Sequence, residues 1–181
     1  MFIGTFIFMG FAAGSQPLVG FNYGAKNYKR VREILKTAMV MTFGIGVAFT
    51  IIFWFAANGL VSFFTPLQDV ISQGTAVLRI SIFSFLILGP QMLASTGIQA
   101  LGKAKESLIL SVARQGIVYI PLLFAMHSLM GFKGLIWAQP LADTITLGIG
   151  LVFLTIILKK STAEKDDSDD ISDKHLIYEQ S

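Results

Sequence analysis

The chain alternates between long apolar segments and short polar connections. None of the apolar segments shows the period-two alternation of apolar and polar positions that marks membrane strands. Each reaches or exceeds the roughly 20 residues that a helix needs to cross a bilayer core of about 30 Å. Because backbone polar groups in lipid must be satisfied within the segment, helices are expected. The predicted membrane-spanning helices cover residues 2–21, 34–63, 74–101, 107–127 and 132–158.

The composition agrees with an all-α integral membrane fold. Hydrophobic residues make up 54% of the 181 residues and charged residues only 14%. In soluble domains, roughly a quarter of all residues are charged. The chain is apolar from Phe2 onward and lacks the basic start of a signal peptide. We therefore expect a multi-pass protein of the cell membrane, with membrane lipid as its surroundings and a first span already in progress at Met1.

Positive charge is concentrated at alternate connections between the spans. The net charge of +3 does not indicate nucleic-acid binding, because the basic residues lie in short connections and at one helix end. By the positive-inside rule, the connections rich in Lys and Arg are cytoplasmic, and the C-terminus then lies inside as well. The basic residues predicted on this side are Lys26, Lys29, Arg30, Arg32, Lys103, Lys105, Lys159 and Lys160.

The tail, residues 161–181, differs in composition from the membrane part, residues 1–160. Acidic residues crowd a short polar stretch that cannot bury a core, so the tail is predicted to be disordered and cytoplasmic. A role in regulation or partner binding is the alternative for this tail. The crowded acidic residues are Asp166, Asp167, Asp169, Asp170 and Asp173.

Two charged residues, Arg114 and Asp143, lie deep within predicted spans. Ionisable groups at such depth commonly mark ion or substrate pathways. Gln139 precedes Asp143 by four residues and shares its helix face, and Gln91 and Gln115 are further polar residues within the spans. Our hypothesis is that Asp143 contacts a cationic substrate or takes part in proton coupling, with the other four as binding candidates. The alternative is a structural bond from Asp143 to Arg114 or to a freed backbone carbonyl.

Prolines and glycines interrupt the spans. Pro90 and Pro140 lie well inside their segments, and each removes a helix hydrogen bond and frees the carbonyl four residues earlier. Broken helices line cavities in many transporters, although prolines are common in membrane helices of every kind. Closely spaced glycines are expected to let helices approach one another. These glycines are Gly10 and Gly14, Gly20 and Gly24, Gly44 and Gly46, and Gly148 and Gly150.

No motif in the sequence indicates an enzyme. His, Asp and Glu residues do not cluster at metal-ligand spacing, and the chain has no Cys. Neither a nucleophile pattern such as G-x-S-x-G nor a phosphate-binding P-loop is present. We therefore expect no catalytic residues, no metal site and no cofactor.

The connection after the first span carries a distinctive pattern, GSQPLVGFNYGAKNYKRVR. Gln16 and Pro17 are followed at fixed spacing by Gly20, Asn22 and Gly24, and then by a basic stretch. This pattern resembles the loop between the second and third helices of the C-terminal half of multidrug and toxic compound extrusion (MATE) transporters.

The resemblance continues over most of the chain up to Lys160. Residues 98–124 resemble the loop between the tenth and eleventh helices of the family, with the Arg114–Gln115 pair in place. Residues 131–146 resemble the start of the twelfth helix. The combination of Q-P, R-Q and P-x-A-D is most similar to the bacterial MepA-type branch.

The resemblance implies a fold and a function. MATE transporters have twelve helices in two six-helix lobes and export cationic drugs and dyes in exchange for H⁺ or Na⁺. The five predicted spans resemble helices eight to twelve, so an N-terminal lobe and helix seven are the implied partners in multidrug efflux. The acidic residues that the family uses on its first helix, or on helices seven and ten, have no counterpart here, since residues 74–101 hold no Asp or Glu.

Two other functional classes stay open. One is a flippase for lipid-linked sugars from the same superfamily, which would need more basic residues within the spans to hold a charged headgroup. The other is a non-transporting membrane fragment or scaffold that packs against an intact transporter.

Overall fold

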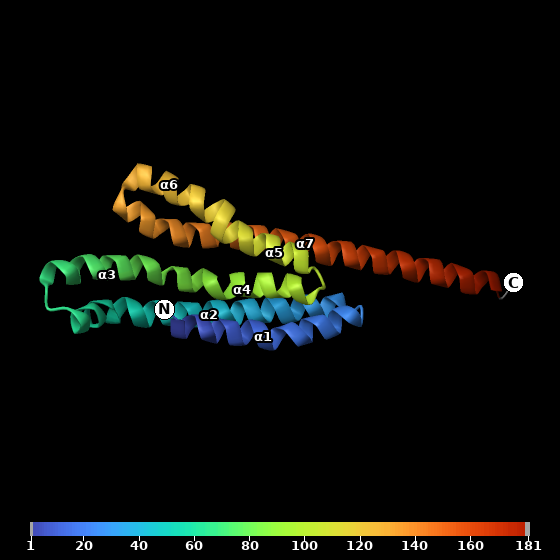
Figure 1. The fold of residues 1–181 in the computed structure, drawn as a ribbon. Helices are drawn as coiled ribbons and strands as arrows, with labels where there is room; N and C mark the ends of the chain where they lie inside the picture. Colours follow the sequence, from blue (N-terminus) through green and yellow to red (C-terminus); the bar gives the residue numbers. More distant parts are fainter. Residues whose placement is uncertain (1, 180–181) are drawn as a thin grey trace.

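The computed structural model describes the backbone of residues 2–179 and the side chains of residues 4–132 and 134–163. Helices form all the regular structure in this described part, and Figure 1 shows their order. They are α1 (Phe2–Gly24), α2 (Tyr28–Phe64), α3 (Gln68–Ile82), α4 (Ser84–Ala100), α5 (Ala104–Val112), the π-helix η1 (Ala113–Val118), α6 (Tyr119–Met130) and α7 (Phe132–Glu179).

The predicted all-α membrane fold is confirmed. Four segments are long and apolar enough to cross a bilayer, and they match the second to fifth predicted spans: Tyr28–Phe64, Gln68–Ala100, Ala104–Met130 and Gly134–Ala163. Helix α1 is not one of these four segments, which were identified among the described residues. That α1 crosses the membrane therefore stays a prediction.

Two of the predicted spans are not regular α-helices from end to end. The third is divided into α3 and α4 at Phe83, whose N–H donates a hydrogen bond to the carbonyl oxygen of Ile80 at 3.2 Å. The fourth is continuous, but its middle turn is the π-helix η1. Hydropathy alone does not register either interruption, because both lie inside apolar runs.

The last helix is longer than predicted. Helix α7 continues to Glu179, so the backbone of the tail, for which disorder is expected, is helical over most of its length. Figure 1 shows this part of α7 projecting past the other helices. The tail contains neither Gly nor Pro, so nothing in its sequence ends a helix that has already begun.

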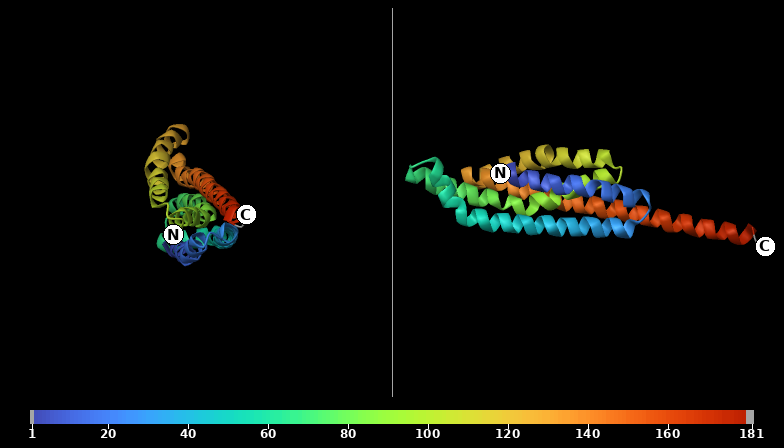
Figure 2. Two further views of the ribbon diagram at one scale, coloured as in Figure 1. Left: turned by 90° about the vertical axis from the view of Figure 1, so that its right-hand side faces the viewer. Right: turned by 90° about the horizontal axis from the view of Figure 1, so that it is seen from below.

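Helix α4 lies in the middle of the bundle. It packs against α1 and α2 on one side and against α7 on the other, as Figures 1 and 2 show. Helix α6 packs only against α7 and η1 within the described part. The α1–α2 and α4–α5 connections lie at the same end of the bundle, which we call the basic end because Lys26 and Lys103 are there.

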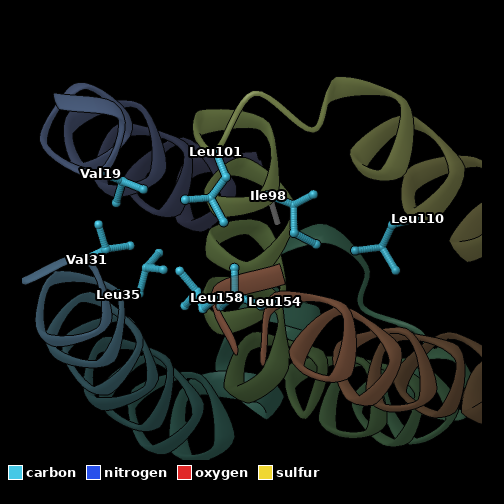
Figure 3. Packing of buried hydrophobic residues seen from close by; sticks show 8 residues of the cluster. All are labelled: Val19, Val31, Leu35, Ile98, Leu101, Leu110, Leu154 and Leu158. Atoms are coloured by element: carbon cyan, nitrogen blue, oxygen red, sulfur yellow. The ribbon is translucent and has the colours of Figure 1, made fainter. Parts of the chain in front are cut away.

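An apolar cluster ties the helices together at the basic end. Its side chains come from α1, α2, α4, α5 and α7 and point toward one another in Figure 3. All are at most 5% exposed: Val19, Val31, Leu35, Ile98, Leu101, Leu110, Leu154 and Leu158. Many other large apolar side chains are exposed, such as Phe55, Phe63 and Phe64. Such a surface suits contact with lipid rather than with water.

The glycine predictions hold at some positions and are wrong at others. A Cβ at Gly46 would overlap the backbone carbonyl oxygen of Phe85, so this glycine lets α2 approach α4. At Gly150 it would lie 3.1 Å from Leu110, and at Gly20 it would lie 3.5 Å from the carbonyl oxygen of Ala100. The remaining five have nothing within 4 Å and do not serve close packing within the described part: Gly10, Gly14, Gly24, Gly44 and Gly148.

Candidate functional site

The motif around Gln16 and Pro17 forms the end of α1 and a tight turn. Asn22 donates from its side chain to the carbonyl oxygen of Leu18 at 2.8 Å, and α1 ends at Gly24. Lys26 has a positive φ of 55°, and the side chain of Asn27 then accepts from the N–H of Arg30 to begin α2. The motif shapes the connection at the basic end and lies apart from the charged residues inside the bundle.

Arg114 and Asp143 form an ion pair between η1 and α7. The Nε of Arg114 donates to Oδ1 of Asp143 at 2.9 Å, although the two residues are 29 positions apart in the chain. The side chain of Asp143 is fully buried, and that of Arg114 is 21% exposed. The second carboxylate oxygen, Oδ2, has no hydrogen-bond partner among the described residues. The pairing that the structural alternative expects is thus present, with one acceptor left over.

The predicted glutamines gather around this ion pair. A cavity of about 310 Å³ is lined by Arg114, Gln115, Tyr119, Gln139, Ala142 and Asp143. Gln91 lies on α4, is 4% exposed, and shares a neighbouring cavity with Arg114 and Gln115. The structure therefore brings together all five residues that the sequence singles out.

Tyr119 also lines the central cavity, and sequence reasoning missed it. An aromatic residue inside an apolar span gives no signal by itself, because aromatic side chains are common on lipid-facing surfaces. The available signal was spacing, since Tyr119 follows Gln115 by four residues and shares its helix face.

The π-helix η1 carries both Arg114 and Gln115. The π-helix ends at Val118, three residues before Pro121. Pro121 has no N–H to donate, and its ring would collide in a regular α-helix with the carbonyl four residues earlier, at Ile117. A π turn adds one residue to the helix and rotates the side chains that precede it relative to those that follow. The wide turn presents Arg114 to Asp143 on α7.

The chemistry of this site is that of one carboxylate, one guanidinium and several amides. No group of three His, Cys, Asp or Glu residues that could hold a metal ion occurs among the residues whose placement is described. The carboxylate of Asp143 lies beside the aromatic ring of Tyr119 and the amide groups of Gln115 and Gln139 in the lining of the central cavity.

Comparisons with known proteins establish the family. The sequence model of the MatE family matches residues 1–125. The chain therefore belongs to the MATE family of membrane transporters, which are not enzymes. This confirms the predicted resemblance and the classification as a multi-pass membrane protein.

Particular relatives agree with this assignment. The multidrug export protein MepA of Staphylococcus aureus strain MSSA476 is 28% identical over 162 residues, which are 89% of this chain and 35% of that protein. The chain thus spans about a third of the length of the curated relatives that it matches. The similarity to the MepA-type branch is confirmed.

Solved structures show the same fold. An inward-facing structure of a multidrug resistance MATE transporter of the MOP superfamily superposes with a TM-score of 0.83 at 18% identity, over 90% of this chain and 38% of that chain. An outward-facing structure with the same description gives a TM-score of 0.82 at 18% identity, over 88% and 36%. The helix arrangement described above is therefore similar to that in structures described as facing either side.

Proposed function

We propose that this chain forms five of the six helices of the C-terminal lobe of a multidrug exporter, with helix seven as a further partner. The exporter moves small cationic organic compounds across the cell membrane in exchange for H⁺ or Na⁺. Family membership and the likeness to multidrug export proteins support this proposal. Since one lobe cannot alternate between two faces alone, the activity requires an N-terminal lobe as a partner. The basic end and the C-terminus are placed in the cytoplasm by the same proposal.

The observation that carries the proposal is the free oxygen of Asp143. This side chain is fully buried, yet its Oδ2 has no partner among the described residues and the carboxylate lines the central cavity. A volume of about 310 Å³ is at the lower end of the range of ligand pockets. It suits a small cation, or the charged end of a larger drug.

Arg114 gives this site a means of exchange. A bare carboxylate inside a bilayer is costly, and the guanidinium of Arg114 neutralises Asp143 at 2.9 Å. An arriving cation must compete with Arg114 for the carboxylate. The site therefore never holds an uncompensated negative charge, whether it is occupied by substrate, by the coupling ion or by Arg114 itself.

The proposal is tested by efflux of a cationic dye from cells that carry the chain together with its N-terminal lobe and helix seven. We expect Asp143→Asn to slow efflux roughly tenfold or more at normal expression, because loss of a buried charged contact costs about 2 kcal/mol or more. Thr144→Ala is the control, since Thr144 is exposed and bonds only its own helix at Pro140 in the described part. Full efflux by the Asp143→Asn variant would contradict a functional role for Asp143.

A double variant separates the functional role from a structural one. Arg114→Gln combined with Asp143→Asn removes both charges and leaves no unpaired one. If the pair only holds η1 to α7, the double variant should recover efflux relative to either single variant. We expect it to remain inactive, because the acceptor for the cation is gone.

Cells that express only these 181 residues should show no efflux, since the second lobe is lacking.

A further inference from the structure

Two more cavities lie on either side of the central one. The first, of about 300 Å³, lies toward the basic end between α4 and the α5–η1 segment. Met92 is the one apolar residue among those that line it, the others being Gln91, Ser95, Thr96, Ser111, Arg114 and Gln115. A cavity with this lining does not suit an acyl chain, because it would leave the polar groups unsatisfied.

Serine hydroxyls mark the outer part of this first cavity. Ser107 donates to the carbonyl oxygen of Ser95 at 3.0 Å, and the two hydroxyl oxygens lie 3.2 Å apart. Ser111 lies 3.4 Å from the same Ser95 hydroxyl and donates to the carbonyl oxygen of Ser107 at 3.0 Å. Ser111 is exposed, so this row of hydroxyls runs from the outside of the lobe toward Gln91.

The second cavity lies beyond Asp143, away from the basic end. It also has a volume of about 300 Å³ and is lined by Thr5, Ser81, Ser84, Phe85, Leu88, Gln139 and Asp143. Polar residues of α1, α3, α4 and α7 thus meet around this cavity, and two of them, Ser84 and Asp143, are buried.

The three cavities follow one another through shared residues. The first shares Arg114 and Gln115 with the central cavity, and the central cavity shares Gln139 and Asp143 with the second. Along α4, from Ser95 to Ser84, the row extends about 16 Å at 1.5 Å per residue. It therefore covers roughly half of a bilayer core of about 30 Å.

Buried acceptors without partners lie along this row. They are Oε1 of Gln91, Oδ2 of Asp143 and Oγ of Ser84, and none has a hydrogen-bond partner among the described residues. Their side chains are 4%, 0% and 5% exposed, respectively. Burying a polar atom without a hydrogen bond is energetically unfavourable. Three such atoms in one row of cavities indicate that a small polar ligand satisfies them.

We propose that these cavities form one water-filled track that runs from the exposed Ser111, on the side toward the basic end, past Asp143 to Ser84. Water fits because the lining offers both donors and acceptors, and because each cavity has room for several molecules. The track gives the buried Asp143 an approach for water and protons.

Cysteine labelling tests the track, and the native chain contains no Cys that would interfere. Single variants Ser111→Cys, Ser95→Cys and Ser84→Cys of the full chain in membrane vesicles are treated with a charged, membrane-impermeant methanethiosulfonate. Val112→Cys is the matched control, because Val112 is adjacent to Ser111 and is 54% exposed on an apolar surface. Ala25→Cys, in the exposed α1–α2 connection, identifies the face that carries the basic end.

We expect the three serine positions to react at least about tenfold faster than Val112→Cys, because the thiolate reacts and apolar surroundings raise a thiol pKa by a unit or more. The reaction should occur from the face at which Ala25→Cys reacts. Gln91→Met should slow the labelling of Ser84→Cys by removing a polar group midway.

Two results would overturn the track. One is labelling of Ser95→Cys and Ser111→Cys no faster than that of Val112→Cys. The other is rapid labelling at these two positions with none at Ser84→Cys. That result would mean that water does not pass the Arg114–Asp143 pair. Size-exclusion profiles like that of the parent protein identify variants that are folded. Labelling needs no transport, so the result stands even if the proposed export activity fails.

Discussion

Asp143 and Arg114 illustrate how strongly a single residue inside a membrane depends on its partner. Asp143 is fully buried on α7, and the guanidinium of Arg114 faces it from η1 at 2.9 Å. Removing one member leaves a charge in a site of low dielectric constant, whereas removing both leaves only polar groups. The free-energy cost of the two single substitutions is therefore not additive.

The unfolding equilibrium in detergent measures this dependence. We expect Arg114→Gln to lower the free energy of unfolding by about 3 kcal/mol, because Asp143 is left unpaired. Adding Asp143→Asn should restore most of that loss. A double variant as unstable as the sum of the two single variants would show that the charges do not stabilise each other.

At the scale of helices, the break between α3 and α4 depends on α2. Gly46 lets the α2 backbone approach the backbone of Phe85 just after the break. One turn further along α2, the hydroxyl of Thr50 lies 3.4 Å from the carbonyl oxygen of Ile82, just before the break. A carbonyl released from a helix in lipid needs such a donor. The interruption at Phe83 is thus a property of two packed segments.

Substitution of neighbouring glycines on α2 tests this support. Gly46→Ala should lower the free energy of unfolding by about 1–3 kcal/mol, because its Cβ would overlap the carbonyl oxygen of Phe85. Gly44→Ala, two residues earlier, has nothing within 4 Å and should be neutral or slightly stabilising. Thermal unfolding of both variants in detergent provides the comparison. Equal stability of the two would contradict the close approach of α2 to α4.

At the scale of the whole molecule, the basic end is held together by contacts between distant parts of the chain. The apolar cluster of Figure 3 joins α1 and α2 to α4, α5 and α7. Beside it, the hydroxyl of Tyr23 lies 2.9 Å from that of Ser161, and Arg32 donates to Thr162 at 3.2 Å. Ser161 and Thr162, at the start of the tail, are therefore attached to the bundle, although they are polar like the rest of the tail.

Two truncated forms of the chain differ in whether the hydrogen bonds of Ser161 and Thr162 are kept. Ending the chain after Ala163 keeps Ser161 and Thr162 and should leave the free energy of unfolding within about 0.5 kcal/mol of the parent value. Ending it after Lys160 removes both hydrogen bonds and should lower the value by about 1 kcal/mol. Chemical unfolding of the purified proteins measures the difference. Two truncated chains of the same stability would show that Ser161 and Thr162 do not anchor the tail.

The sequence by itself determined that the long apolar runs of this protein form helices and that the fold is that of a membrane protein. Long apolar runs in lipid have few alternatives to the helix, because each backbone polar group must bond locally. The sequence also predicted a connection after the first span, which the structure limits to residues 25–27. Depth within a span also sufficed to single out Asp143 and Arg114, since charges are rare there.

Only the tertiary structure decided the features that depend on contacts between segments. The break at Phe83, the meeting of Arg114 with Asp143 and the row of cavities each require two or more helices in a particular register. Neither Gly44 nor Gly46 differs from the other in local sequence preference, and only one of them meets a neighbouring backbone. Packing between helices sets these features, because the hydropathy of one segment carries no information about the rotation of the next.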